Sequence, residues 1–208
     1  MLNTRSLTFA YDHENTFSFP DISLEQGEDL LILGPSGIGK TTLLHLLAGL
    51  LFPKSGHVEL MGTVLHDLPT KQLDQFRGTH IGLVFQRPHF VRSLSLQENL
   101  ALVQYLAGKK QDQKRLKEVL RSLDIESKQS KRPYSLSQGE QQRATIAMAV
   151  LNDPQLILAD EPTASLDNDN CENVVTLLKD QAASTGAQLV IITHDRRLKV
   201  HFKNHIEL

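Results

Sequence analysis

Two glycine-containing segments of this sequence could each bind an anion. The first, GPSGIGKT at 34–41, lies between the apolar run DLLIL and the helix-like run TTLLHLLAGLL. Glycines let a backbone wrap phosphates with its amides pointing inward, while Lys40 would reach the outer phosphates and the Thr41 hydroxyl would face Mg²⁺. We therefore expect a nucleotide phosphate site formed by Gly34, Pro35, Ser36, Gly37, Ile38, Gly39, Lys40, Thr41 and Thr42.

Polar side chains follow three other apolar runs. LILADE at 156–161 ends in two carboxylates, so Asp160 could hold the hydration shell of a metal and Glu161 could orient or deprotonate a water. His194 ends LVIITH and could contact a terminal phosphate, although a structural histidine at a strand end is the alternative. Gln86 ends GLVFQ and could meet the metal or the attacking water. Together these residues indicate nucleotide hydrolysis.

The second segment is SLSQGEQQR at 135–143, directly before the apolar run ATIAMAVL. Ser137 and Gly139 at a helix start suit anion binding, with an ordinary helix N-cap at Ser137 as the alternative. The first segment already provides a phosphate site, so these residues alone do not say what the second one would bind.

These side chains require a sheet whose strands end at one edge. We expect buried parallel strands over 29–34, 79–86, 154–161 and 187–195, and helices over 41–51, 93–108, 111–125 and 139–153. Residues 1–28 read as two or three strands of a β layer, and 56–65 as a hairpin around Gly62. The expected fold is α/β: a mostly parallel sheet with helices, an N-terminal antiparallel layer and an inserted helical subdomain.

Composition narrows the functional class. The 208 residues fit one domain, or a domain with a subdomain, and the net charge of −2 gives no general attraction to nucleic acid. Cys171 is the only cysteine, so an intrachain disulfide is excluded.

No apolar run approaches the roughly 20 residues that span a bilayer, and the N-terminus lacks a secretory signal. His201 and His205 lie four apart without a metal-ligand pattern, and we expect them at the surface.

GPSGIGKT, VFQ, LSQGEQQR, LILADE, PTASLD and ITHD occur in an order and spacing that resemble the nucleotide-binding subunit of ATP-binding-cassette (ABC) transporters. The resemblance covers essentially the whole chain. It implies a P-loop NTPase core at 1–86 and 154–208, a helical subdomain at about 87–153, and ATP and Mg²⁺ as cofactors. It also implies a head-to-tail dimer of identical chains, in which Ser137 and Gly139 contact the ATP held by the other chain.

The same resemblance gives roles to further residues. Tyr11 resembles the aromatic that stacks on adenine, with a plain strand tyrosine as the alternative. Asp167 resembles a residue of the loop that communicates between subunits, and Gln86 the residue that couples the site to the helical subdomain. Arg143 would orient the region after the second segment or form a surface salt bridge. The commonest family form is Leu-Ser-Gly-Gly-Gln, and its third and fifth residues are replaced here: Gln138 stands for a glycine and Glu140 for the glutamine.

The partner implied by the resemblance is an integral membrane permease, with the chain in the cytoplasm on the inner face of the membrane and touching the membrane only through that partner. An apolar groove formed by Phe90, Val91, Leu94 and Leu96 would receive a permease helix, unless these residues are core. The short chain and LDQFRGTHIGLVFQ are most similar to the lipoprotein-release, macrolide-export and cell-division subgroup. An iron–sulfur assembly ATPase remains an alternative, and a small P-loop kinase would leave LSQGEQQR unexplained.

Overall fold

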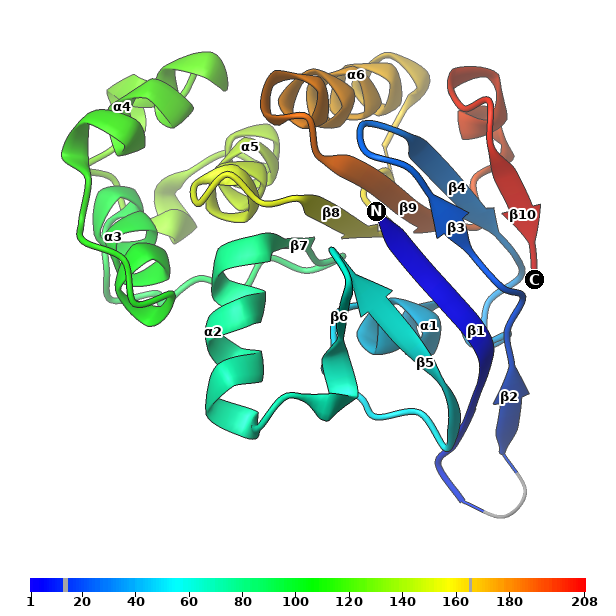
Figure 1. Ribbon diagram of the computed structural model, residues 1–208. Helices are drawn as coiled ribbons and strands as arrows, with labels where there is room; N and C mark the ends of the chain where they lie inside the picture. The colour runs from blue at the N-terminus through cyan, green and yellow to red at the C-terminus, as the bar shows by residue number, and fades with distance from the viewer. Residues whose placement is uncertain (13–14, 165) are drawn as a thin grey trace.

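The computed structural model describes residues 1–12, 15–164 and 166–208. A parallel sheet lies at the centre, a second, antiparallel sheet lies on one side of it, and three helices form a separate group at the far end from the C-terminus (Figure 1). The chain has the α/β P-loop NTPase fold that the motifs predict.

The parallel sheet carries the strand ends that matter for chemistry. Its order is β10-β4-β9-β8-β7, and its strands are β4 (Asp29–Leu33), β7 (Ile81–Val84), β8 (Leu156–Asp160), β9 (Gln188–Thr193) and β10 (His205–Glu207). All neighbouring pairs in this sheet run parallel, so the loops after β4, β7, β8 and β9 leave from the same edge.

Alternate residues of these strands enter two different hydrophobic cores. Leu158 and Ile192 pack with the leucines of α1 (Lys40–Leu47) and with the antiparallel sheet. Ile157 and Ile191 face the opposite way, toward α5 (Gln138–Val150) and α6 (Asn168–Thr185). Burial on both faces explains why the strands read as continuous apolar runs.

The antiparallel sheet contains the three expected N-terminal strands and the expected hairpin. Its order is β2-β1-β5-β6, with β3 paired to β1. The strands are β1 (Leu2–Ala10), β2 (Thr16–Ser18), β3 (Ser23–Leu24), β5 (Ser55–Leu60) and β6 (Thr63–Val64). Residues 55–64 therefore join the N-terminal strands in one layer over α1 (Figure 1).

The helical group consists of α3 (Leu96–Leu106), α4 (Gln113–Ser122) and α5, which pack on one another. Each begins at a side chain that accepts a hydrogen bond from the first turn: Ser95, Asp112 and Ser137. Short 3₁₀ turns link the helices and strands, namely η1 (Leu65–Asp67), η2 (Glu126–Lys128), η3 (Pro133–Ser135) and η4 (Arg196–His201).

Several elements differ from the sequence-based expectation. Helix α1 ends at Leu47 rather than at residue 51, because Gly49 takes a left-handed φ of 63° and turns the chain away. The strand expected over 79–86 spans only 81–84, since Thr79 and His80 complete α2 (Thr70–His80). We did not anticipate α2, α6 or β10. None of the helices in the described part of the chain is both long and apolar enough to cross a membrane.

Candidate nucleotide-binding site

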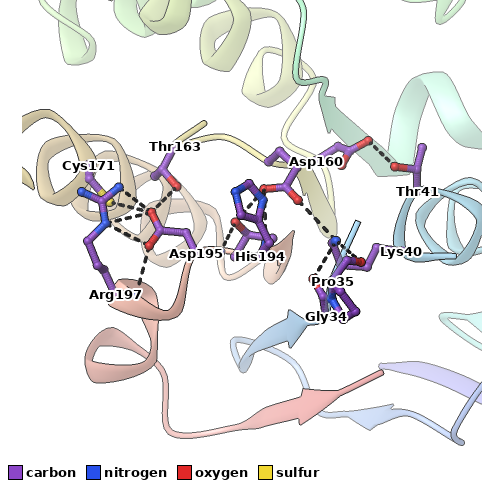
Figure 2. Close-up of polar contacts among 12 residues, drawn as sticks. Gly34, Pro35, Lys40, Thr41, Asp160, Thr163, Cys171, His194, Asp195 and Arg197 are labelled. Carbon is purple, nitrogen blue, oxygen red and sulfur yellow. Dashed lines mark hydrogen bonds and ion pairs between the residues drawn. The ribbon is translucent and has the colours of Figure 1, made fainter. Parts of the chain in front are cut away.

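The phosphate loop connects β4 to α1, as its flanking sequences predict. Lys40 folds back over this loop, and its ammonium donates hydrogen bonds of 2.9 Å to the Gly34 carbonyl and 3.0 Å to the Pro35 carbonyl (Figure 2). Only 6% of Lys40 is exposed, and its Nζ also lies 3.5 Å from Oε1 of Glu161. A buried cation is thus held above a loop whose glycines keep the backbone accessible to an anion.

Gly39, at the start of α1, can only be glycine. Its φ is 103°, and a Cβ atom there would lie 2.6 Å from Cδ1 of Phe17. Sequence reasoning missed Phe17, because a phenylalanine alternating with polar residues in a short strand carries no signal of a ligand site. Its ring nevertheless forms one wall of the cavity beside the loop.

That cavity has a volume of about 300 Å³ and brings together residues from distant parts of the chain. Residues of the phosphate loop face polar side chains from the ends of three other strands. Its lining comprises Phe17, Ser36, Gly37, Gly39, Lys40, Thr41, Thr42, Gln86, Glu161 and His194. Ile38 is exposed, and its side chain lies over Gly34.

Asp160 lies at the end of β8 beside the phosphate loop. Thr41 Oγ1 donates a 3.1 Å hydrogen bond to Asp160 Oδ2, and no described residue pairs with the buried Oδ1 (Figure 2). Burial raises the pKa of Asp160 above its usual value. A hydroxyl, a carboxylate and nearby nucleotide phosphates are the oxygen ligands that Mg²⁺ prefers. No cage of three or more metal-ligating side chains occurs within the described ranges.

Glu161 directly follows Asp160 and leaves the strand through a left-handed φ of 46°, a conformation that is uncommon for a non-glycine residue. Its amide donates to the Ile192 carbonyl, and its Oε2 accepts from the Thr193 hydroxyl at 2.7 Å. Nδ1 of His194 lies 2.9 Å from the same oxygen. Burial alone would raise the pKa of Glu161, but the hydrogen bonds from His194 and Thr193 outweigh it and lower the pKa. An ionised carboxylate therefore faces the cavity.

Gln86, which follows β7, lines this cavity and also a second one of about 610 Å³. Ser137 and Gly139 line the second cavity and are absent from the lining of the first. Within one chain, the second glycine-containing segment thus faces the second cavity and not the first, although Gln86 and Glu161 line both cavities.

The geometry at Ser137 bears out its N-cap interpretation. Its Oγ accepts from the Glu140 amide at 3.3 Å, and Glu140 Oε2 accepts from the Ser137 amide at 2.8 Å. A side-chain hydrogen bond between Ser137 and the Glu140 carboxylate also helps to lower the pKa of Glu140. Gly139 is exposed, has no positive φ, and has no atom within 4 Å of the position a Cβ would take. The packing of this chain therefore does not require glycine at 139.

Tyr11 is 60% exposed and touches the phosphate loop from the antiparallel sheet. Its hydroxyl lies 3.1 Å from Thr42 Oγ1, and its ring meets Phe9 and Phe17 edge-on. It stands next to the cavity without lining it. An exposed ring at this place is free to meet a flat ligand.

Asp167 caps α6, because its carboxylate accepts from the Asn170 amide at 2.9 Å. It lines neither cavity, and Ser165 of the PTASLD motif lies outside the described residues. Arg197, which sequence reasoning missed, ties this loop to the segment after His194. It donates to Asn168 Oδ1 at 2.6 Å and to the Leu166 carbonyl.

Arg197 also pairs with Asp195, which lies beside Thr163 and Cys171 (Figure 2). Arg143 donates to the Leu123 carbonyl at 3.0 Å, so it orients the helical group by a hydrogen bond. His201 is half-buried and His205 is exposed.

The apolar groove expected from Phe90, Val91, Leu94 and Leu96 is not formed by all four residues. Leu96 begins α3 and is fully buried within the helical core, and Phe90 packs against the same core. Val91 is 43% exposed, and Leu94 is half-buried. The alternative interpretation, core packing, is therefore correct for Leu96 and Phe90.

The fold and this site define a P-loop nucleoside triphosphatase. Residues 19–164 match the sequence family described as ABC transporter. The chain therefore belongs to the ABC transporter family, as an ATP-binding subunit with ATPase activity.

Three relatives are similar over most of this chain. It is 37% identical over 87% of its length to LolD, the lipoprotein-releasing system ATP-binding protein of Chromohalobacter salexigens, and covers 77% of that protein. It is 42% identical over 90% of its length to HrtA of Staphylococcus aureus, named as a hemin import ATP-binding protein, and covers 86% of it. It is 36% identical over 90% of its length to the macrolide export ATP-binding/permease protein MacB of Mannheimia succiniciproducens, but covers only 29% of it.

Among solved structures, the dimer of MJ0796, a bacterial ABC transporter cassette, superposes with a TM-score of 0.88 and 31% identity, covering 100% of this chain and 94% of that one. A second MJ0796 dimer, in a post-hydrolysis state bound to ADP and Pi, gives the same values. The similar cassettes are thus dimeric, and one holds the products of ATP hydrolysis.

Proposed function

We propose that this chain powers a membrane permease as half of a head-to-tail dimer, in which each ATP–Mg²⁺ is enclosed by the phosphate loop of one chain and the Ser137 segment of the other. The observation that carries this proposal is the exposed Gly139, which the packing of its own chain does not require. Its amide is available to a phosphate from outside, at the start of a 13-residue helix, and the exposed Ser137 hydroxyl would turn from Glu140 to that phosphate.

We assign a separate role in ATP binding or hydrolysis to each of the residues around the first cavity. The loop amides and Lys40 hold the phosphates, and Tyr11 stacks on the base. Thr41, Asp160 and Gln86 would hold Mg²⁺, which would offset phosphate charge. Glu161 accepts the proton of the attacking water, while His194 fixes that carboxylate and faces the terminal phosphate. Asp167, at the start of α6, lies on the loop that meets the second chain.

We assign the cassette two parts, a nucleotide-binding core at 1–86 and 154–208 and a helical subdomain at 87–153. The permease would dock where these parts meet. A groove of about 530 Å³ lies there, lined mainly by small and apolar residues of α2, β7, α3 and α5. Leu106, which lines this groove, is 70% exposed, and the preceding residue Tyr105 is 68% exposed; a helix of the permease would cover both. This docking would hold the chain at the inner face of the membrane.

We infer that the transporter is of the export type and that it moves its permease mechanically, and two of the relatives' names support the export type. LolD is named for lipoprotein release and MacB for macrolide export, and the MacB name joins an ATP-binding and a permease function in one protein. HrtA is named for import, so the substrate and direction need direct measurement.

Affinity capture tests the proposal. Tagged Glu161→Gln protein, held with ATP and Mg²⁺, is recovered from detergent-solubilised cells and its partners are identified by mass spectrometry. A stoichiometric membrane protein with several spans is the expected result. Recovery of soluble partners only would overturn the transporter assignment and favour an assembly ATPase. Leu106→Ser should reduce capture, and Val200→Ser, at an exposed apolar side chain outside that groove, is its control.

A further inference from the structure

Glu140 places a negative charge where the proposed dimer must accept a phosphate. It follows Gly139 in the first turn of α5 and replaces the neutral glutamine of the commonest ABC sequence. A carboxylate at a helix start stabilises the helix, but it also weakens the positive potential that draws an anion to the same place. Something else must therefore offset this charge.

Both oxygens of Glu140 have partners. Oε2 accepts from the Ser137 amide at 2.8 Å, which completes the capping box. Oε1 lies 2.9 Å from Nζ of Lys128, a residue of η2, twelve positions earlier in the chain. The hydrogen bond from Lys128, followed by that from Ser137, lowers the pKa of Glu140. Glu140 is thus fully ionised, and its charge is balanced by a lysine rather than by a proton.

We propose that Lys128 neutralises Glu140 so that the Ser137–Gly139 helix start can bind the ATP phosphates of the other chain. This inference rests on the proposed head-to-tail dimer. Lys128 is a positioning residue that acts through Glu140 and has no contact of its own with the nucleotide.

An ordinary structural ion pair between η2 and α5 is the competing explanation, and the two make different predictions. If the ion pair itself matters, removing either Lys128 or Glu140 should weaken ATP-dependent dimer formation to the same extent. If the charge matters, the strength of ATP-dependent dimer formation should follow the net charge of the pair. That charge is zero in the parent, −1 in Lys128→Met, +1 in Glu140→Gln and zero in the double variant. Glutamine can still complete the capping box, so Glu140→Gln leaves the helix start intact.

The test uses full-length chain in the Glu161→Gln background and measures, by light scattering, the ATP concentration that gives half-maximal dimer. We expect Lys128→Met to raise this concentration about fivefold, Glu140→Gln to lower it, and the double variant to return to the parent value. The Lys128→Met shift should shrink in 1 M salt, where the screening length is about 3 Å. Lys114→Met is the matched control, because Lys114 forms an i,i+4 ion pair with Glu118 on α4.

Other outcomes would overturn the inference. Equal weakening by all three variants would make Lys128–Glu140 a structural bridge, and an unchanged Lys128→Met would leave it without a role in the site. If the parent itself stays monomeric in saturating ATP, the head-to-tail dimer fails, and the role of Lys128 fails with it. The parent measurement thus separates failure of the dimer from failure of the charge argument.

Discussion

Nδ1 of His194 lies 2.9 Å from Oε2 of Glu161. The two residues end neighbouring parallel strands, so the sheet itself fixes their separation. The histidine holds the carboxylate ionised and turned into the cavity, beside the Lys40 ammonium that completes the charge arrangement. The cavity thus holds an ionised carboxylate between a histidine and a lysine.

Glu161→Gln should reduce ATP hydrolysis by about 10²- to 10⁴-fold, because it removes the proton acceptor and keeps the side-chain shape. ATP binding should persist, since Lys40 keeps its contacts with the phosphate loop. Phosphate release and calorimetric ATP binding measure the two effects. Hydrolysis close to that of the natural protein would remove Glu161 from the role of base.

Asp160→Asn should stabilise the nucleotide-free protein. It should also remove the additional stabilisation that Mg²⁺ gives to the protein in the presence of ATP. The pKa of Asp160 is raised by burial, so its contribution to stability is greatest below the usual value of 3.8 and is lost as pH rises through the folded-state pKa. At neutral pH the ionised side chain therefore lowers stability, and asparagine should raise the melting temperature by about 2–4 °C. This gain should fade toward pH 3.8. A lower melting temperature of the nucleotide-free variant at neutral pH would contradict the conclusion that the ionised Asp160 side chain lowers stability.

Ser137→Ala should slow ATP hydrolysis at least about tenfold while monomer affinity for ATP is unchanged, because the hydroxyl serves the other chain. Ser95→Ala is a closely matched control. Ser95 caps α3 through the same capping box that Ser137 forms on α5, so both variants should lose about 1 kcal/mol of stability. Equal ATPase activity of the two variants would reduce Ser137 to a helix cap.

Arg197→Ala should lower the rate of hydrolysis without changing ATP affinity, because Arg197 joins the loop at Leu166–Asn168 to the segment after His194. The neighbouring Arg196→Ala is the control, since Arg196 is 80% exposed on its side chain and only reaches Glu207 at 4.0 Å. Steady-state kinetics compare the two. If both variants behave alike, the Arg197 contacts have no part in catalysis.

The sequence predicts most of the parallel sheet because its strands are buried on both faces and end in chemically distinctive residues. Asp160, Glu161 and His194 were recognisable for that reason, and so was the phosphate loop. Helix capping was readable as well, since Ser95 stands three residues before Glu98.

Contacts between distant segments could not be predicted. Phe17 faces the cavity only because Gly39 leaves room for its ring, and Arg197 reaches across to a loop thirty residues earlier. Leu96 was expected either in a groove for a permease helix or in the core, and it is the first residue of α3 and is fully buried. These contacts depend on how distant segments pack together, and the residue pattern around each position does not show that packing.

Thiol cross-linking between two different chains tests the composite site most directly. One chain carries Ser36→Cys in the phosphate loop and the other Gln138→Cys in the Ser137 segment, both exposed positions, with Cys171→Ser and Glu161→Gln in each. With ATP and Mg²⁺, a short cross-linker should join one chain of each kind, and much less product should form without nucleotide. Absence of the mixed product in ATP, while both thiols react freely with a small reagent, would contradict the head-to-tail arrangement.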